Sequence, residues 1–238
     1  MNILSVLYCE VLKVLRSHVF WFVFLFFGIG PVMMGIMGNS PADSGQGNWE
    51  LYLEGAVNTI TGVGLVGFSF IAAWVFGREF TDKTVKDLIA KPVSRSCIVS
   101  SKFIVIFAWS LLYLLYMFSL SLLTGLTLGL ADFAPSLVMD AFIIFSTASL
   151  MFIIVATPSA FVANITKGYL APIGLILVLA IAINALGNTA FAPYFPWLIP
   201  ALYLKTGSLS LSSIIILLST GIAGVVGTFA WWMFAEKG

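Results

Sequence analysis

Residues 103–128 read FIVIFAWSLLYLLYMFSLSLLTGLTL, a run without a single charged side chain. The hydrocarbon core of a bilayer needs about 20 apolar residues in a helix. Backbone amides find no hydrogen-bonding partner in hydrocarbon, so the run must be helical, and it lacks the two-residue alternation of a membrane β-strand. With five similar runs it predicts six transmembrane helices, at 19–38, 56–77, 103–128, 137–162, 168–187 and 212–234. The predicted fold class is an all-α polytopic membrane protein with a single transmembrane domain over residues 1–238.

The composition of the whole chain excludes a soluble domain. Of the 238 residues, 61% are hydrophobic and 9% are charged, against about 25% charged in an ordinary globular domain. A formal net charge of +1 gives no field that would attract nucleic acid, so no nucleic-acid partner is expected. Cys9, Cys97 and His18 are too few and too scattered for a metal site, and we interpret the cysteines as reduced thiols.

Lysines and arginines fall almost entirely on one side of the predicted spans. Ten of the eleven lie before the first span, between the second and third, between the fourth and fifth, or after the sixth: Lys13, Arg16, Arg78, Lys83, Lys86, Lys91, Arg95, Lys102, Lys167 and Lys237. Only Lys205 lies on the other side. Because cytoplasmic loops carry the excess of basic residues, both termini are expected in the cytoplasm.

Residues 1–17 have the pattern of an amphipathic helix. On a helical wheel the apolar side chains between Ile3 and Leu15 fill one half, while Ser5, Cys9, Glu10, Lys13 and Arg16 fill the other. This pattern predicts an interfacial helix along the cytoplasmic leaflet. A cytoplasmic extension of the first span is the alternative, because neither Pro nor Gly interrupts the chain before Trp21.

The loop GREFTDKTVKDLIAKPVSRSCIVSSK, residues 77–102, holds six of the eleven basic residues. From Thr81 to Ala90 its apolar and charged side chains occupy opposite halves of a wheel, which predicts an amphipathic helix of about three turns. Pro92 disfavours helix at the residue before it, so the helix should stop there. The simpler interpretation is that these charges only anchor the topology.

The same loop resembles the cytoplasmic loop of ABC type-2 exporter permeases, in particular those of bacitracin resistance and lantibiotic immunity. The resemblance rests on three segments, Arg78-Glu79-Phe80, Asp82-Lys83-Thr84 and Pro92-Val93-Ser94-Arg95, and extends to the six-helix layout. It implies a bacterial cell membrane and makes residues 78–102 a coupling loop whose helix docks on an ATPase subunit, with Glu79 near the hinge. The residues expected at that contact are Glu79, Phe80, Thr81, Thr84, Val85, Leu88, Ile89 and Pro92.

Nothing in the chain itself can bind ATP in the usual way. The phosphate-cradling G-x-x-x-x-G-K-[ST] loop is missing, and no Gly-Lys pair occurs anywhere in the sequence. No catalytic residue, cofactor or metal is therefore expected here, and ATP and Mg are assigned to a separate P-loop ATPase subunit. Because six helices cannot enclose a central pathway symmetrically, a second copy or a homologous permease is expected beside this one, in contact with membrane lipid.

Two further groups of residues are candidates for the transport pathway. Residues 190–212 are aromatic and interrupted by prolines, which suits either an interfacial anchor or, as the resemblance favours, a re-entrant-like external gate at Pro193, Pro196 and Trp197. Polar residues within the spans are few. Asn58, Thr61, Ser69 and Asn184 are candidates to line a substrate pathway, but the spans lack the acid-base chain of a proton-coupled carrier.

The predicted function is the permease subunit of an ATP-driven exporter, not an enzyme by itself. Its substrate would be hydrophobic or amphipathic, such as an antimicrobial peptide or a lipid-like molecule. Two alternatives stay open: an ATP-independent membrane scaffold or immunity protein, and an ABC permease for another cargo such as ions or metal-maturation species. An intramembrane enzyme is disfavoured because the spans lack paired acids, a His cluster or a Ser-His arrangement at membrane depth.

Overall fold

The computed structural model describes residues 3–38, 48–90, 92–187 and 189–234. Over these ranges the chain is helical and contains no β-strand, only an isolated bridge between Asn48 and Ala131. In chain order the helices are α1 (Ile3–Leu15), α2 (His18–Gly38), α3 (Trp49–Thr81), α4 (Val85–Ala90), α5 (Arg95–Thr127), α6 (Pro135–Ile165), α7 (Leu170–Leu186), α8 (Ile199–Thr206) and α9 (Leu211–Phe234), with 3₁₀ turns η1 (Ala192–Tyr194) and η2 (Pro196–Leu198) between α7 and α8. The all-α prediction is confirmed.

Four of these helices, α3, α5, α6 and α9, are long and apolar enough to cross a membrane. A fifth span is added if α1 and α2, which meet at a bend of 58°, are counted as one. The chain is thus a multi-pass membrane protein. The run expected at 168–187 forms α7, whose 17 residues reach about 26 Å at 1.5 Å per residue, which is short of the roughly 30 Å hydrocarbon core.

The bend between α1 and α2 rules out a straight extension of the first span into residues 1–17. Ser17 lies between the two helices, and its Oγ accepts a hydrogen bond from the backbone N–H of Val19 at 3.1 Å. A serine in this position satisfies a free donor at a helix start, so it begins α2 without Pro or Gly. The separate N-terminal helix expected from the sequence is therefore present.

Helix α3 is longer than the predicted second span, 56–77, at both ends. It begins after Asn48, whose side chain accepts from the backbone N–H of Glu50 at 2.8 Å, and continues to Thr81. The single helix predicted from Thr81 to Ala90 was wrong. Residues 82–84 form a turn, with Lys83 at a φ of 57°, and only Val85–Ala90 is helical beyond it.

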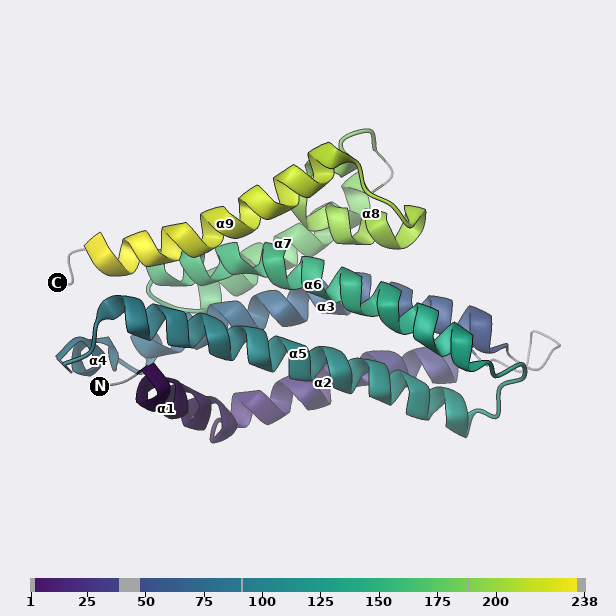
Figure 1. Ribbon diagram of the computed structural model, residues 1–238, viewed down its shortest axis with the longest axis horizontal. Coiled ribbons are helices and arrows are strands. Elements are labelled where there is room, and N and C mark those ends of the chain that lie inside the picture. The colour runs from purple at the N-terminus through teal and green to yellow at the C-terminus, as the bar shows by residue number, and fades with distance from the viewer. Residues whose placement is uncertain (1–2, 39–47, 91, 188, 235–238) are drawn as a thin grey trace.

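The helices form two groups around a central pair. Helix α3 packs against α6, with α9, α7 and α8 on one side and α1, α2 and α5 on the other (Figure 1). The start of α1, the end of α9 and α4 all lie at the same end of the molecule (Figure 1). This is the arrangement expected when the first and last helices of the chain begin and end on the same side of the membrane.

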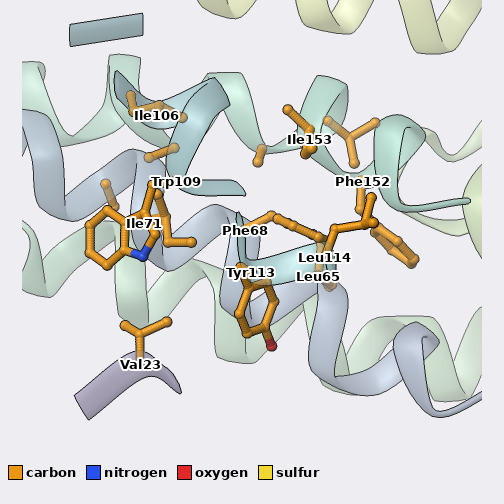
Figure 2. Packing of buried hydrophobic residues seen from close by; sticks show 14 of the residues in the cluster. Val23, Leu65, Phe68, Ile71, Ile106, Trp109, Tyr113, Leu114, Phe152 and Ile153 are labelled. Atoms are coloured by element: carbon orange, nitrogen blue, oxygen red, sulfur yellow. The ribbon is translucent and has the colours of Figure 1, made fainter. Parts of the chain in front are cut away.

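Large side chains fill the space between α2, α3, α5 and α6. Figure 2 shows Val23, Phe68, Trp109 and Phe152 among the buried residues of this cluster. The indole of Trp109 packs between the rings of Phe20 and Trp74, with centroid distances of 5.3 and 5.6 Å. Edge-on and tilted contacts of this kind are the favoured geometries for aromatic pairs.

Small residues allow α9 to approach α6 closely. A Cβ on Gly224 would lie 2.5 Å from the backbone nitrogen of Pro158, which interrupts α6. Because Pro158 cannot donate to the carbonyl of Ile154, the hydroxyl of Thr157 donates to it instead at 2.9 Å, and also to the carbonyl of Gly221 at 2.9 Å. Thr157, next to the proline in α6, thus also holds α9 in place.

Candidate functional site

Four charged side chains from three helices meet at the end of the molecule that carries α4. Lys13 Nζ lies 2.6 Å from Glu10 Oε1 and 2.9 Å from Glu79 Oε1. Lys102 Nζ lies 2.8 Å from Glu10 Oε2 and 2.8 Å from Glu79 Oε1. Each lysine therefore bridges the same two glutamates, and together the four residues form a closed charge ring that joins α1, α3 and α5.

The charge ring is buried although its members are ionic. The side chains of Lys102, Glu79 and Glu10 are 0%, 2% and 4% exposed, and only Lys13 reaches solvent appreciably, at 31%. Lys102 Nζ also donates to the carbonyl of Val75 at 3.2 Å. Two positive and two negative charges cancel, so the arrangement is stable as a set, whereas removing one member would leave a buried charge without compensation.

Electrostatics keeps the α1 members of the ring charged. Burial alone would raise the pKa of Glu10, but the positive charges of Lys102 and Lys13 outweigh it and hold that pKa below its usual value. Burial likewise opposes the charge on Lys13, yet the carboxylates of Glu10 and Glu79 outweigh it and raise the pKa of Lys13. Both shifts favour the ionised ring at neutral pH.

Glu79 also connects the charge ring to the turn that follows α3. Its carboxylate accepts a short hydrogen bond from the hydroxyl of Thr84, and its carbonyl accepts from the backbone N–H of Thr84 at 2.9 Å. The neighbouring Arg78 donates to the carbonyl of Lys13 at 3.1 Å, and its guanidinium lies 4.5 Å from the ring centroid of Trp74. A displacement of the turn would therefore be transmitted to α1 as well as to α3.

The turn and α4 present charged side chains to solvent. Asp82, Lys83 and Asp87 are exposed, whereas Leu88 is 9% exposed and belongs to the hydrophobic core of this chain. Leu88, expected at the ATPase contact, thus packs against this chain itself. The wheel identifies two halves of a helix but not which half faces the chain itself, and here Leu88 points inward.

The other residues expected at the ATPase contact are divided between the interior and the surface. Phe80 packs edge-on against Trp231 of α9, with ring centroids 5.4 Å apart. Thr81 and Pro92 are exposed, and Val85 is half-buried. The side chain of Ile89 lies outside the described residues. The structure therefore leaves Thr81 and Pro92 accessible, while Glu79, Thr84, Phe80 and Leu88 make contacts within the chain.

Of the four candidate pathway residues, the structure describes the side chains of Asn58 and Ser69. Asn58 is exposed on α3 and lines a hollow of about 250 Å³ with Glu50, Glu54 and Asp140. In the described part of the chain no three His, Cys, Asp or Glu side chains are close enough to hold a metal ion. Ser69, further along α3, is buried, and its hydroxyl has no hydrogen-bond partner among the described residues. The side chains of Thr61 and Asn184 lie outside the described residues.

The proline-rich segment expected to form an external gate is compact. Pro193 lies in η1, and Pro196 and Trp197 lie in η2, all three half-buried. The carbonyl of Pro193 accepts a hydrogen bond from the hydroxyl of Ser213 at 3.0 Å, which fixes the segment to α9. The following helix α8 packs against α6. The segment thus lies alongside α6 and α9 in the half of the molecule away from α4, and α3, α5 and α6 extend beyond it (Figure 1).

Glu10, Lys13 and Lys102 were not recognised as site residues from the sequence. Lys102 immediately precedes a long apolar run, and Glu10 lies in a helix that is otherwise largely apolar. A charge in such a position must find a partner or reach water, which is the signal that could have identified it. The partner itself could not be read from the sequence, because Glu10 and Lys102 are far apart in the chain.

Comparison with known proteins places these features in a family. A family model described as ABC-2 family transporter protein matches residues 6–183, which include all four members of the charge ring. The bacitracin transport permease protein BCRB of Bacillus licheniformis is 24% identical over 135 residues, 57% of this chain and 65% of that protein. The uncharacterized protein YhcI of Bacillus subtilis (strain 168) is 38% identical over 89 residues, 37% of this chain and 28% of that protein. The chain thus covers less than two thirds of either relative.

Proposed function

This chain belongs to the ABC-2 family of transporter permeases, and we propose that it is the membrane-spanning subunit of an ATP-driven exporter. In this proposal a separate P-loop ATPase binds ATP and Mg, and two permeases, identical or homologous, enclose the pathway. The six spans would be α2, α3, α5, α6, α7 and α9, and the bilayer would thin around α7, which is the shortest of them. The end of the molecule that carries α4 and both chain ends would then face the cytoplasm of a bacterial cell.

The observation that carries the proposal is the buried charge ring directly behind the turn at residues 82–84. Thr84 binds Glu79 through both its hydroxyl and its backbone amide, and Glu79 binds Lys13 and Lys102. A movement that an ATPase imposes on the turn would therefore displace α1, α3 and α5 together. Direct bonds of this kind would convert a local displacement of the turn into movement of α3 and α5, which is what a coupling element in an exporter must do.

The face offered to the ATPase is charged rather than apolar. Asp82, Lys83 and Asp87 are exposed around α4, while Leu88 holds α4 against the chain from inside. Exposed charges of both signs favour a contact set by electrostatic complementarity, which governs the rate and register of association. We assign the docking face to these three residues together with the exposed Thr81 and Pro92.

The substrate we propose is hydrophobic or amphipathic. One relative is named for the transport of bacitracin, so an antimicrobial peptide or a lipid-like molecule is the substrate class we propose. The segment formed by η1, η2 and α8, with Pro193, Pro196 and Trp197, is the proposed external gate. Asn58 lies in a hollow beside Glu50 and Asp140, at the end where a substrate would leave.

The test is purification of the tagged chain from its native membrane in mild detergent. We expect a P-loop ATPase subunit to co-purify and the complex to hydrolyse ATP, while the chain purified alone does not. A deletion strain should become more sensitive to a cell-envelope antimicrobial peptide, and complementation should require both subunits. Protection that persists without any ATPase subunit would instead indicate an ATP-independent immunity protein, and hydrolysis by the isolated chain would contradict the proposal.

A further inference from the structure

A hollow of about 690 Å³ opens where α1 bends into α2 and faces the end of α3. It lies beside the charge ring but is a separate feature, because three ring members, Glu10, Glu79 and Lys102, do not line it. Its lining comes from α1, α2, α3 and the residue before α7, and consists of Cys9, Leu12, Lys13, Arg16, Ser17, His18, Val19, Trp74, Arg78, Asp82 and Tyr169. Most of its ionisable side chains are basic.

The hollow has an excess of positive charge that the protein does not neutralise. The charge of Lys13 is already balanced within the ring. Arg16 and Arg78 then face only one carboxylate in the lining, that of Asp82, which leaves one net positive charge. In the part of the chain that the structure describes, neither arginine is within ion-pair distance of an acidic side chain. A ligand with one negative charge would restore the balance.

Apolar side chains border the hollow in the sequence and point outward. Leu15, which is 45% exposed, comes immediately before the lining residues of the bend, and Trp21, which is 61% exposed, comes two residues after them. In a membrane protein such side chains contact lipid, and tryptophan is characteristic of the headgroup level. These side chains would place the hollow at headgroup level, with the phosphate of a lipid and its acyl chains on adjacent surfaces.

From this juxtaposition we propose that the hollow binds the phosphate group of a phospholipid headgroup. A phosphodiester carries one negative charge, and guanidinium groups donate two parallel hydrogen bonds to phosphate oxygens. Arg16 would supply these donors, together with the N–H groups of Arg78 that do not donate to the carbonyl of Lys13. The hydroxyl proton of Ser17 is also available, because its oxygen already accepts from Val19. Since the lining joins α1, α2 and α3, a bound headgroup would hold the bend between α1 and α2 in place.

Thermal unfolding of the full chain in neutral detergent tests the proposal, with three additives: short-chain phosphatidylglycerol, a neutral diacylglycerol of the same chain length, and inorganic phosphate. We expect phosphatidylglycerol to raise the melting temperature and the diacylglycerol not to. In Arg16→Gln the apparent affinity should fall by at least about tenfold, because one charge-assisted donor is lost. Arg16 is exposed, so this variant should fold normally.

Lys167→Gln is the matched control, since Lys167 is exposed, carries the same charge and lies outside the hollow. It should bind phosphatidylglycerol like the unmodified protein. If Arg16→Gln and Lys167→Gln weaken binding equally, general surface charge explains the effect and the proposal fails. It fails as well if the diacylglycerol stabilises as much as phosphatidylglycerol. If inorganic phosphate alone reproduces the full stabilisation and Arg16→Gln removes it, the phosphate site stands and the assignment to lipid is overturned.

Discussion

Lys102 Nζ lies 2.8 Å from Glu79 Oε1, and both side chains are buried. This ion pair fixes α5 to α3 just before α3 ends at Thr81. Because Glu10 and Lys13 close the ring from α1, the three helices are held together at their ends rather than through the membrane core alone. Their relative movement at this end requires the ring to break or to move as a whole.

Replacing one member of the ring should be strongly destabilising. Lys102→Met leaves Glu10 and Glu79 buried with only Lys13 between them, and breaking a buried ion pair from one side costs about 3–5 kcal/mol. Glu79→Gln should cost a similar amount, because it leaves two lysines facing one carboxylate. Denaturant unfolding in detergent, followed by tryptophan fluorescence, measures both losses in the free energy of unfolding.

The double variant, Glu79→Gln with Lys102→Met, distinguishes a charge ring from ordinary packing. It keeps the pair of Glu10 and Lys13, and its remaining charges cancel. We expect it to be more stable than the sum of the single effects predicts, by about 0.5–3 kcal/mol. Strict additivity would show that the two side chains contribute independently, and the ring would then have no role as a unit.

The orientation of α4 gives a further prediction, in which substitutions on its two faces have opposite outcomes. Leu88→Ala should lower the free energy of unfolding by about 2–5 kcal/mol, because Leu88 belongs to the core of this chain. Asp87→Lys should change stability by less than about 0.5 kcal/mol, since Asp87 is exposed, yet weaken association with the ATPase. Unfolding of the isolated chain and co-purification of the ATPase measure the two effects separately. If Leu88→Ala keeps full stability but loses the ATPase, the apolar face docks outward instead.

The sequence was sufficient to predict helices because hydrocarbon leaves the backbone no alternative. It was less informative where water and neighbouring helices decide the outcome. The break after Thr81 has no Gly or Pro to signal it, and Lys83 adopts a positive φ of 57° without either. The wheel over residues 81–90 assumed one continuous helix, and it could not say where Leu88 is buried, because a partner surface and the chain's own core are equally good places for it.

The charge ring shows the same limit for the site. The segment Arg78-Glu79-Phe80 directed attention to Glu79, which lies next to the end of α3. Its partners come from α1 and α5, and their meeting depends on how three helices pack. Glu10 was assigned to the polar half of an interfacial helix, where water would be its default neighbour. In the structure only Glu10 and Lys13 of that half face α3 and α5. Ser5, Cys9 and Arg16 of the same half are exposed, and so are Leu4 and Tyr8 of the apolar half.

Because α6 and α9 approach closely, adding a single methyl group at Gly224 should lower the free energy of unfolding. In Gly224→Ala the new Cβ would lie 2.5 Å from the backbone nitrogen of Pro158, which has no flexible end to move away. Overpacking of this kind costs about 1–3 kcal/mol. Gly62→Ala in α3 is the control, because nothing lies within 4 Å of its added Cβ, and it should be neutral or stabilise by up to about 1 kcal/mol. Equal effects on thermal unfolding would contradict the contact.

The orientation of the bundle can be tested with cysteines at its two ends. Ser208 is exposed in the segment between α8 and α9, and Cys9 is exposed on α1 at the end that carries α4. Because ten of the eleven basic residues lie on the side assigned to the cytoplasm, an impermeant thiol reagent should label Ser208→Cys in intact cells. Native Cys9 should react only after the membrane is permeabilised. A background with Cys9→Ser and Cys97→Ser isolates the introduced thiol, and Cys97→Ser alone leaves Cys9 as the native reporter. Labelling of Cys9 from outside would require the opposite orientation, with α4 and its charged face away from any cytoplasmic ATPase.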